Sequence, residues 1–173
     1  MSFEAFEASI LSQGLKAVAG HWNSARGARR MPGWQDLRPS AIAKQLPMVW
    51  VYAYDPATDD FIGRLGGEAI NRIFGRNIKD ARLSELSAII DRDKLIARLK
   101  RVMQEPALVS SVGPMFVRDD YSGAGERIIM PLAADRQNAD AVLGATLYKI
   151  EGIVPSEFEK LGSRDQWFSL DGA

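Results

Sequence analysis

The sequence contains no cysteine and only one histidine, His21. Without a thiol, the chain cannot form a disulfide, a thiolate zinc site, an iron–sulfur cluster, a cysteine nucleophile or a cysteinyl-flavin adduct. A lone histidine also excludes Cys–His catalysis and metal sites built from several histidines. We therefore expect no metal site, and any chemistry is limited to carboxylates, hydroxyls and basic side chains.

An excess of one charge is missing as well, because the 22 basic and 22 acidic residues cancel. No overall field then steers the chain toward nucleic acid. No apolar run approaches the roughly 18 residues of a membrane-spanning helix, and the N-terminal segment carries Glu4 and Glu7 without the early basic residues of a secretory signal. At 173 residues and 46% hydrophobic content, one folded domain is expected. We expect it to be soluble and cytoplasmic, with no nucleic-acid partner and no membrane span.

Hydrophobic periodicity predicts an N-terminal helix, five strands and a helical insertion. The helix extends from an N-cap at Ser2 to about Trp22. The expected strands cover residues 48–54, 61–65, 108–117, 126–133 and 141–150. Helices of the insertion are expected at residues 68–74, 83–86 and 91–105. A short C-terminal helix is expected at residues 155–161, and the residues after it look loosely held.

The first predicted strand is apolar on both sides, since Trp50, Tyr52 and Tyr54 alternate with Val49 and Val51. An antiparallel sheet with one wet face would alternate apolar and polar residues. Two groups of strands around a helical insertion give an α+β fold with an antiparallel sheet. Its second face must be buried by the N-terminal helix, by a dimer partner or by both, because soluble monomers rarely expose so large an apolar patch. The matching stripe on the helix, and the expected interface, is Leu11, Leu15, Val18 and Trp22.

Short motifs follow one another in a recognisable order along residues 21–144. They are His21-Trp22, Arg26-Gly27, Met31-Pro32, Arg38-Pro39, Leu46-Pro47, Phe61-Ile62-Gly63-Arg64-Leu65-Gly66-Gly67, Ile73-Phe74-Gly75-Arg76, Glu126-Arg127, Pro131-Leu132 and Leu143-Gly144. With these motifs and this element order, the chain resembles a stand-alone bacterial PAS-like family formerly described as a domain of unknown function. The resemblance implies a five-stranded sheet of order 2-1-5-4-3 and a sensory or regulatory role with no established reaction. It also implies a homodimer with the N-terminal helices at its centre.

On that resemblance, the chain divides into three parts. Residues 1–38 form a helix and a connecting loop that pack on the sheet or on a dimer partner. Residues 39–152 form the PAS-like core, and residues 153–173 form a C-terminal extension.

Arg64 is a candidate ligand-binding residue because it stands inside an otherwise apolar predicted strand. A charge on a strand covered on both faces must be paired or must bind an anion. We expect its guanidinium to be held, either by a carboxylate such as Glu68, Glu126 or Asp36 or by an anionic ligand; simple exposure of its charged end is the remaining alternative. The other candidates are methionines and aromatic residues, which line adaptable pockets and also fill ordinary cores. They are Trp50, Tyr52, Phe74, Met103, Met130 and Tyr148.

We expect a structural or surface role for His21, because a histidine complements the dipole at the end of a helix. The PAS resemblance argues against haem, since haem-sensing PAS domains present their histidine from the helical insertion. We expect no cofactor and a colourless protein, with non-covalent flavin left open because it needs only a pocket. Arg26, Arg29 and Arg30 are expected to pair with acidic residues in a loop packed on the sheet. Contact with a partner or nucleotide is the alternative.

No motif identifies a catalytic residue, so the preferred hypothesis is a non-enzymatic sensory or regulatory domain. It would bind a small ligand or a signalling protein and pass the signal on by association. An enzyme on the same α+β fold is one alternative, which a cavity with two convergent carboxylates would favour. A structural interaction domain is the other, which a filled core would favour. A fold alone does not decide among them.

Overall fold

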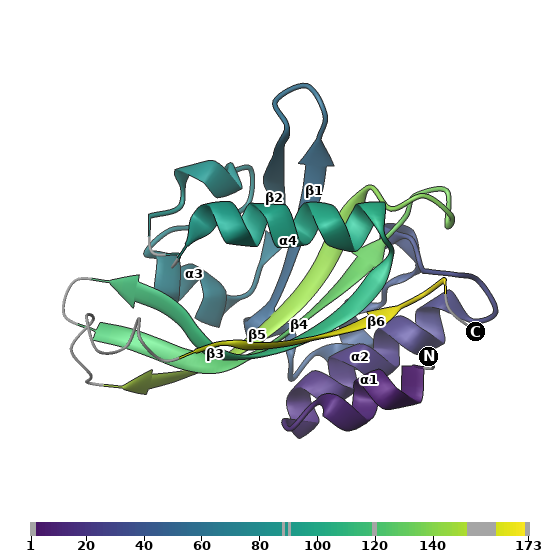
Figure 1. The fold of residues 1–173 in the computed structure, drawn as a ribbon, viewed down its shortest axis with the longest axis horizontal. Coiled ribbons are helices and arrows are strands. Elements are labelled where there is room, and N and C mark those ends of the chain that lie inside the picture. The colour runs from purple at the N-terminus through teal and green to yellow at the C-terminus, as the bar shows by residue number, and fades with distance from the viewer. Residues whose placement is uncertain (1–2, 88, 90, 119–120, 152–161, 172–173) are drawn as a thin grey trace.

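Six antiparallel strands form one sheet in the order β2-β1-β5-β4-β3-β6, with helices on both of its faces (Figure 1). The computed structural model describes residues 3–87, 89, 91–118, 121–151 and 162–171. The predicted α+β class and the order 2-1-5-4-3 are confirmed, and a sixth strand extends the sheet beside β3. The strands are β1 (Val49–Asp55), β2 (Asp60–Gly66), β3 (Ala107–Arg118), β4 (Tyr121–Leu132), β5 (Ala141–Glu151) and β6 (Arg164–Ser169).

Two helices, α1 (Phe3–Ser9) and α2 (Gln13–Arg26), stand where the sequence predicted one. The chain breaks between them because Ser12 caps α2, its hydroxyl accepting a hydrogen bond from an amide in the first turn. The carboxylate of Glu126 on β4 also accepts hydrogen bonds from the amides of Leu11 and Ser12, at 2.6 and 2.9 Å. Unpaired amides at the start of a helix need such acceptors. The sheet therefore fixes the place where α2 begins.

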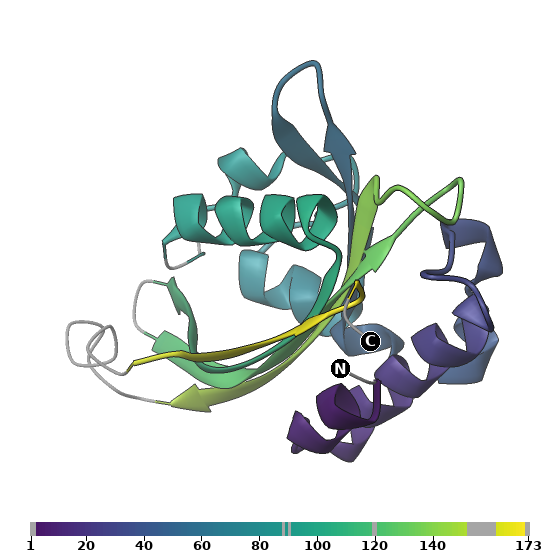
Figure 2. The ribbon, with the colours of Figure 1, turned by 45° about the vertical axis from the view of Figure 1, so that its right-hand side comes forward.

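The outer face of the sheet, defined as the face that carries α1 and α2, is closed by these two helices (Figure 2). Leu15, Val18 and Trp22 are fully buried there, and the indole N–H of Trp22 donates to the carbonyl oxygen of Pro131 at 2.9 Å. The prediction that the N-terminal helix buries the second face is confirmed. Assigning these three residues to a subunit interface is wrong, because they pack on their own sheet and have no exposed surface left. Of the predicted stripe only Leu11, at 74% exposed, remains accessible.

The inner face, opposite to the outer one, carries α3 (Glu68–Phe74) and α4 (Arg92–Gln104) (Figure 2). Both helices lie between β2 and β3 in the sequence, as predicted. Leu99 of α4 is fully buried against Trp50 and Tyr52, whose side chains leave β1 on this face. Alternate side chains of β1 therefore enter two separate hydrophobic cores, one on each face of the sheet.

β6 is the element that the sequence did not predict, because its residues were expected to be loosely held. It pairs with β3 and also contacts α4 through its inner-face side chains. Asp165 forms an ion pair with Arg98 at 2.5 Å, and the guanidinium of Arg101 lies 4.2 Å from the ring centroid of Trp167. Only two of its residues, the neighbours Trp167 and Phe168, are apolar, which is a weak signal for a strand without its partners.

β4 begins five residues earlier than the sequence predicted, because the glycine-rich stretch before Glu126 is strand and not turn. Gly125 pairs with Tyr148 in a close approach of two strands. A Cβ at position 125 would lie 2.1 Å from the carbonyl oxygen of Leu147, so this pairing requires glycine. The helix predicted at residues 155–161 lies outside the described residues.

Candidate functional site

Four of the seven predicted ligand-binding residues meet on the inner face. Trp50, Tyr52, Phe74 and Tyr148 line a cavity of about 20 Å³ between the sheet, α3 and α4. This volume holds about one water molecule, so the core is filled at the place where the sequence suggested a pocket. Met103 packs against the same core from α4 and does not line the cavity.

The other two predicted residues, Met130 and Arg64, lie on the outer face. Met130 is fully buried in the core under α2. Arg64 is exposed and lies beside Val51, because the pairing of β1 with β2 is irregular after Val51 and turns both Arg64 and Leu65 outward. The expectation that its guanidinium is held by a carboxylate is wrong, since no residue that the structure describes forms an ion pair or hydrogen bond with it. Exposure, the remaining alternative, is what the structure shows.

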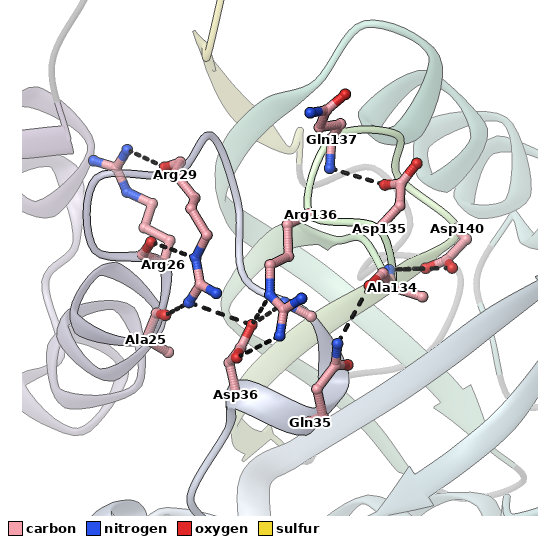
Figure 3. Close-up of polar contacts among 11 residues, drawn as sticks. Ala25, Arg26, Arg29, Gln35, Asp36, Ala134, Asp135, Arg136, Gln137 and Asp140 are labelled. Atoms are coloured by element: carbon pink, nitrogen blue, oxygen red, sulfur yellow. Dashed lines mark hydrogen bonds and ion pairs between the residues drawn. The ribbon is translucent and has the colours of Figure 1, made fainter.

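Asp36, one of the carboxylates proposed as a partner for Arg64, instead holds the N-terminal loop against the turn between β4 and β5 (Figure 3). It contacts Arg29 at 3.4 Å and Arg136 at 3.2 Å. The hydrogen bond from Arg136 lowers the pKa of Asp36. Arg30 pairs with Asp171. Arg29 and Arg30 therefore pair with acidic residues, as predicted, whereas Arg26 bonds to Asn23 and to the carbonyl oxygen of Arg29.

A row of four polar side chains crosses the inner face at one level of the sheet. Thr146 on β5 stands directly opposite Arg127 on β4, and Arg127 stands directly opposite Ser111 on β3. Ser111 in turn stands opposite Asp165 on β6. Side chains that face each other across neighbouring strands lie about 5 Å apart at Cβ. Four strands thus bring a hydroxyl, a guanidinium, a second hydroxyl and a carboxylate into one line.

Arg127 is the central residue of this row and is only 8% exposed. Its Nε donates to the hydroxyl of Thr146 at 3.2 Å, which also accepts the indole N–H of Trp50 at 2.9 Å. The hydroxyl of Tyr148 is a further partner. Burial lowers the pKa of Arg127, and the charge interaction with Tyr148 raises it, but an arginine in a protein keeps its proton. Arg127 is a buried cation that forms no ion pair with a carboxylate of the described residues, although the more distant charge of Asp165 also raises its pKa.

Beside Arg127 lies a second cavity of about 500 Å³, which we call the Arg127 cavity. It is enclosed by α4, β3, β4 and β6, and its volume falls in the range of small-molecule sites. The hydroxyl of Ser111 lines it, is 2% exposed and has no hydrogen-bond partner in the part of the chain that the structure describes. Buried hydroxyls are nearly always hydrogen-bonded. An unused hydroxyl next to a buried guanidinium that lacks a carboxylate at ion-pair distance therefore marks this cavity as the candidate binding site.

Sequence reasoning treated Arg127 only as a family landmark, and Glu126 as a landmark and a possible partner of Arg64, and so missed this site. The available signal was their position: two charged neighbours precede the apolar run of β4, in a sheet covered on both faces. Consecutive strand residues point to opposite faces, so one charge had to enter each core. Glu126 enters the outer core and caps α2, and Arg127 enters the inner one.

His21 plays a structural part on the outer side. Its Nε2 accepts a hydrogen bond from the amide of Arg38 at 3.0 Å, and burial lowers the pKa of the imidazole, with the charge of Arg38 adding to the effect. Within the described residues no three histidine, aspartate or glutamate side chains gather as a metal site would require.

Comparison with known proteins identifies the fold. A family model described as a PAS domain matches residues 11–147. Among the curated proteins nothing matches. No helix in the described part of the chain combines the length and apolarity needed to span a membrane.

Solved structures with a similar fold include two of VqmA from Vibrio cholerae. One is a VqmA–ligand–DNA complex, with a TM-score of 0.50 and 11% identity over 63% of this chain and 49% of that chain. The other is a VqmA dimer in the absence of its target DNA, with a TM-score of 0.51 and 11% identity over 64% of this chain and 49% of that one. The chain thus spans about half the length of these proteins. At such identity the likeness concerns the fold alone.

Proposed function

Because this chain belongs to the PAS domain family, we propose that it is a non-catalytic sensory or regulatory domain that binds a small ligand in the Arg127 cavity. The observation that carries the proposal is the pair formed by Arg127 and Ser111. Both side chains are buried and both face a cavity of about 500 Å³. Within the described residues the hydroxyl of Ser111 has no hydrogen-bond partner, and Arg127 bonds only to hydroxyl groups, with no carboxylate at ion-pair distance. Burying a charged guanidinium costs several kcal/mol of folding free energy. A purely structural domain would gain nothing from that cost.

The enzyme alternative was to be favoured by convergent carboxylates, and two carboxylates do line the Arg127 cavity. Each one is already neutralised: Asp91 pairs with Lys94 at 2.7 Å, and Asp165 pairs with Arg98 at 2.5 Å. The hydrogen bond from Lys94 lowers the pKa of Asp91. A general acid near neutral pH needs the opposite shift, so the pair does not suit acid–base catalysis.

The proposal includes output by association, with a second copy of the chain or with a signalling protein. Leu11, Val112 and Leu147 are exposed apolar residues on the outer side. Val112 and Leu147 flank Glu126 on the strands either side of it, and the amide of Leu11 donates to that carboxylate. These residues lie next to the start of α2, where their exposed side chains would be available to a partner. The absence of a nucleic-acid partner stays a prediction.

Native mass spectrometry of the purified chain tests the ligand and the oligomeric state together. We expect a retained small molecule, or, after the protein is stripped and refolded, saturable binding in a thermal-shift screen of polar metabolites. We also expect the mass of a dimer. The variant Arg64→Gln serves as a control, since its side chain is exposed on the other face. A chain that binds no small molecule in either experiment would contradict the ligand-binding function.

A further inference from the structure

Five charged side chains line the Arg127 cavity, and their net charge determines which ligands it favours. Asp91 and Lys94 form one ion pair, and Arg98 and Asp165 form another. Arg127 is left over, so the described walls of the cavity carry one net positive charge. A single uncompensated cation that is itself buried favours a ligand with one negative charge, since a dianion would leave a second charge unpaired.

The donors in the cavity suit a planar anion with two oxygen atoms. The guanidinium of Arg127 is a planar fork that binds a carboxylate through two parallel hydrogen bonds. Its Nε donates to Thr146, and the guanidinium also bonds to the hydroxyl of Tyr148. A guanidinium carries more N–H groups than these two contacts use, so donors on its terminal nitrogen atoms remain for a ligand. The hydroxyl of Ser111, directly opposite on β3, has its hydrogen bond to spare. The two groups can share one carboxylate.

Part of the remaining wall is apolar. Leu95 from α4 and Pro114 and Met115 from β3 line the same cavity. Leu95 and Met115 are themselves buried, at 8% and 6% exposure. A group that extends from the carboxylate therefore meets hydrocarbon and a thioether, which accept varied apolar shapes.

We propose that the Arg127 cavity binds a small organic monocarboxylate, with its carboxylate on Arg127 and Ser111 and a short apolar group against Leu95 and Met115. This inference rests on the proposed ligand-binding function and specifies the chemical class of the ligand. One molecule would then give Ser111 a hydrogen-bond partner and Arg127 a counter-charge. Because a buried guanidinium without a carboxylate partner is costly in the free protein, binding an anion there is expected to be favourable.

The test uses the full chain, stripped of bound molecules, with butyrate and benzoate as probes and isothermal titration calorimetry as the measurement. Each acid is compared with its own primary amide, which has the same shape without the charge, and inorganic phosphate serves as the multiply charged anion. We expect the acids to bind at one site per chain and the amides and phosphate to bind at least tenfold more weakly. Equal affinity for an acid and its amide would overturn the assignment.

Two variants locate the bound anion. Arg127→Gln is expected to lower the affinity for the acids by at least 100-fold, since it removes the charged fork. Ser111→Ala keeps the cation and is the safer variant for folding, with an expected loss of about tenfold for one hydrogen bond to a charged group. Arg64→Gln is expected to bind as the parent does. Unchanged binding by a folded Arg127→Gln or by Ser111→Ala would contradict the site.

Failure of this inference and failure of the proposed function give different results. If native mass spectrometry finds a neutral ligand, or if amides bind as tightly as acids, the ligand-binding function stands and the carboxylate assignment is wrong. If neither acids, amides, phosphate nor any retained molecule binds, both are wrong.

Discussion

Replacing Arg127 with methionine is expected to stabilise the free protein while abolishing its binding of a carboxylate. The methionine occupies the space of the arginine stem and removes the buried charge. The guanidinium loses much of its hydration in this place and recovers only a hydrogen bond to Thr146 and an interaction with Tyr148. No carboxylate among the described residues is left unpaired by the change, which distinguishes it from breaking a buried ion pair.

The size of the effect follows from two opposing contributions. Exchange of a buried charged group for a well-packed apolar one is often neutral or stabilising by about 1–4 kcal/mol, after the lost hydrogen bonds are counted. Each kcal/mol moves the midpoint of thermal unfolding by about 2–4 °C for a chain of this length. A gain of about 2 kcal/mol therefore corresponds to a midpoint roughly 4–8 °C higher.

The assay is thermal unfolding followed by circular dichroism, with urea unfolding at 25 °C as an independent measure of the free energy. Arg64→Met is the matched control, because Arg64 is exposed on the outer face and the same exchange there should change stability by less than about 0.5 kcal/mol. A midpoint that falls by several degrees in Arg127→Met, with Arg64→Met unchanged, would refute the reasoning. Arg127 would then be a structural residue of the inner core, and the argument for a ligand would lose its physical basis.

Three further predictions concern the outer side. Glu126→Gln should cost about 1–3 kcal/mol in urea unfolding, because two amides at the start of α2 exchange a charged acceptor for a neutral one; an unchanged midpoint would contradict the capping role. The pKa of His21 is lowered below 6.5 in the folded chain, so the unfolded state binds more protons and stability should fall as the pH drops below about 6.5. His21→Gln should remove that part of the pH dependence in melts between pH 7.5 and 5, and an identical profile would contradict it. Leu15→Ala should destabilise the fold by about 2–5 kcal/mol by leaving a cavity in the outer core, whereas Leu11→Ala should leave unfolding unchanged and, in light scattering, weaken association; the reverse pattern would contradict the assignment of these residues.

The sequence predicted the sheet and its helices well because those elements depend on patterns that are local. Periodicity located β1, β2, α3 and α4 to within a residue or two. The places where it failed depend on contacts distant in the chain. The break before Ser12 is enforced by Glu126, more than a hundred residues away, and β6 forms because β3 and α4 offer it partners.

The candidate site was predicted only in part for the same reason. The alternation of β1 placed Trp50 and Tyr52 on one face, and the structure brings them together with Phe74 and Tyr148. Arg64 was misjudged because an irregularity between β1 and β2 shifted the register by one residue, which turns a strand residue to the other face. Such a shift leaves no trace in the periodicity of a strand seven residues long.

The position of Glu126 and Arg127 on consecutive residues of β4 has a mechanical consequence. One peptide group connects Glu126, whose carboxylate holds the start of α2, to Arg127, whose guanidinium faces the cavity. The two faces of the sheet are therefore linked through two neighbouring residues of β4. We expect a twist of β4 that moves Arg127 to move Glu126 as well, and so to shift its hydrogen bonds to the amides of Leu11 and Ser12. No hinge or domain movement is required for such coupling. The link spans only the side chains of Arg127 and Glu126, and it ends beside Leu11, the exposed residue between α1 and α2.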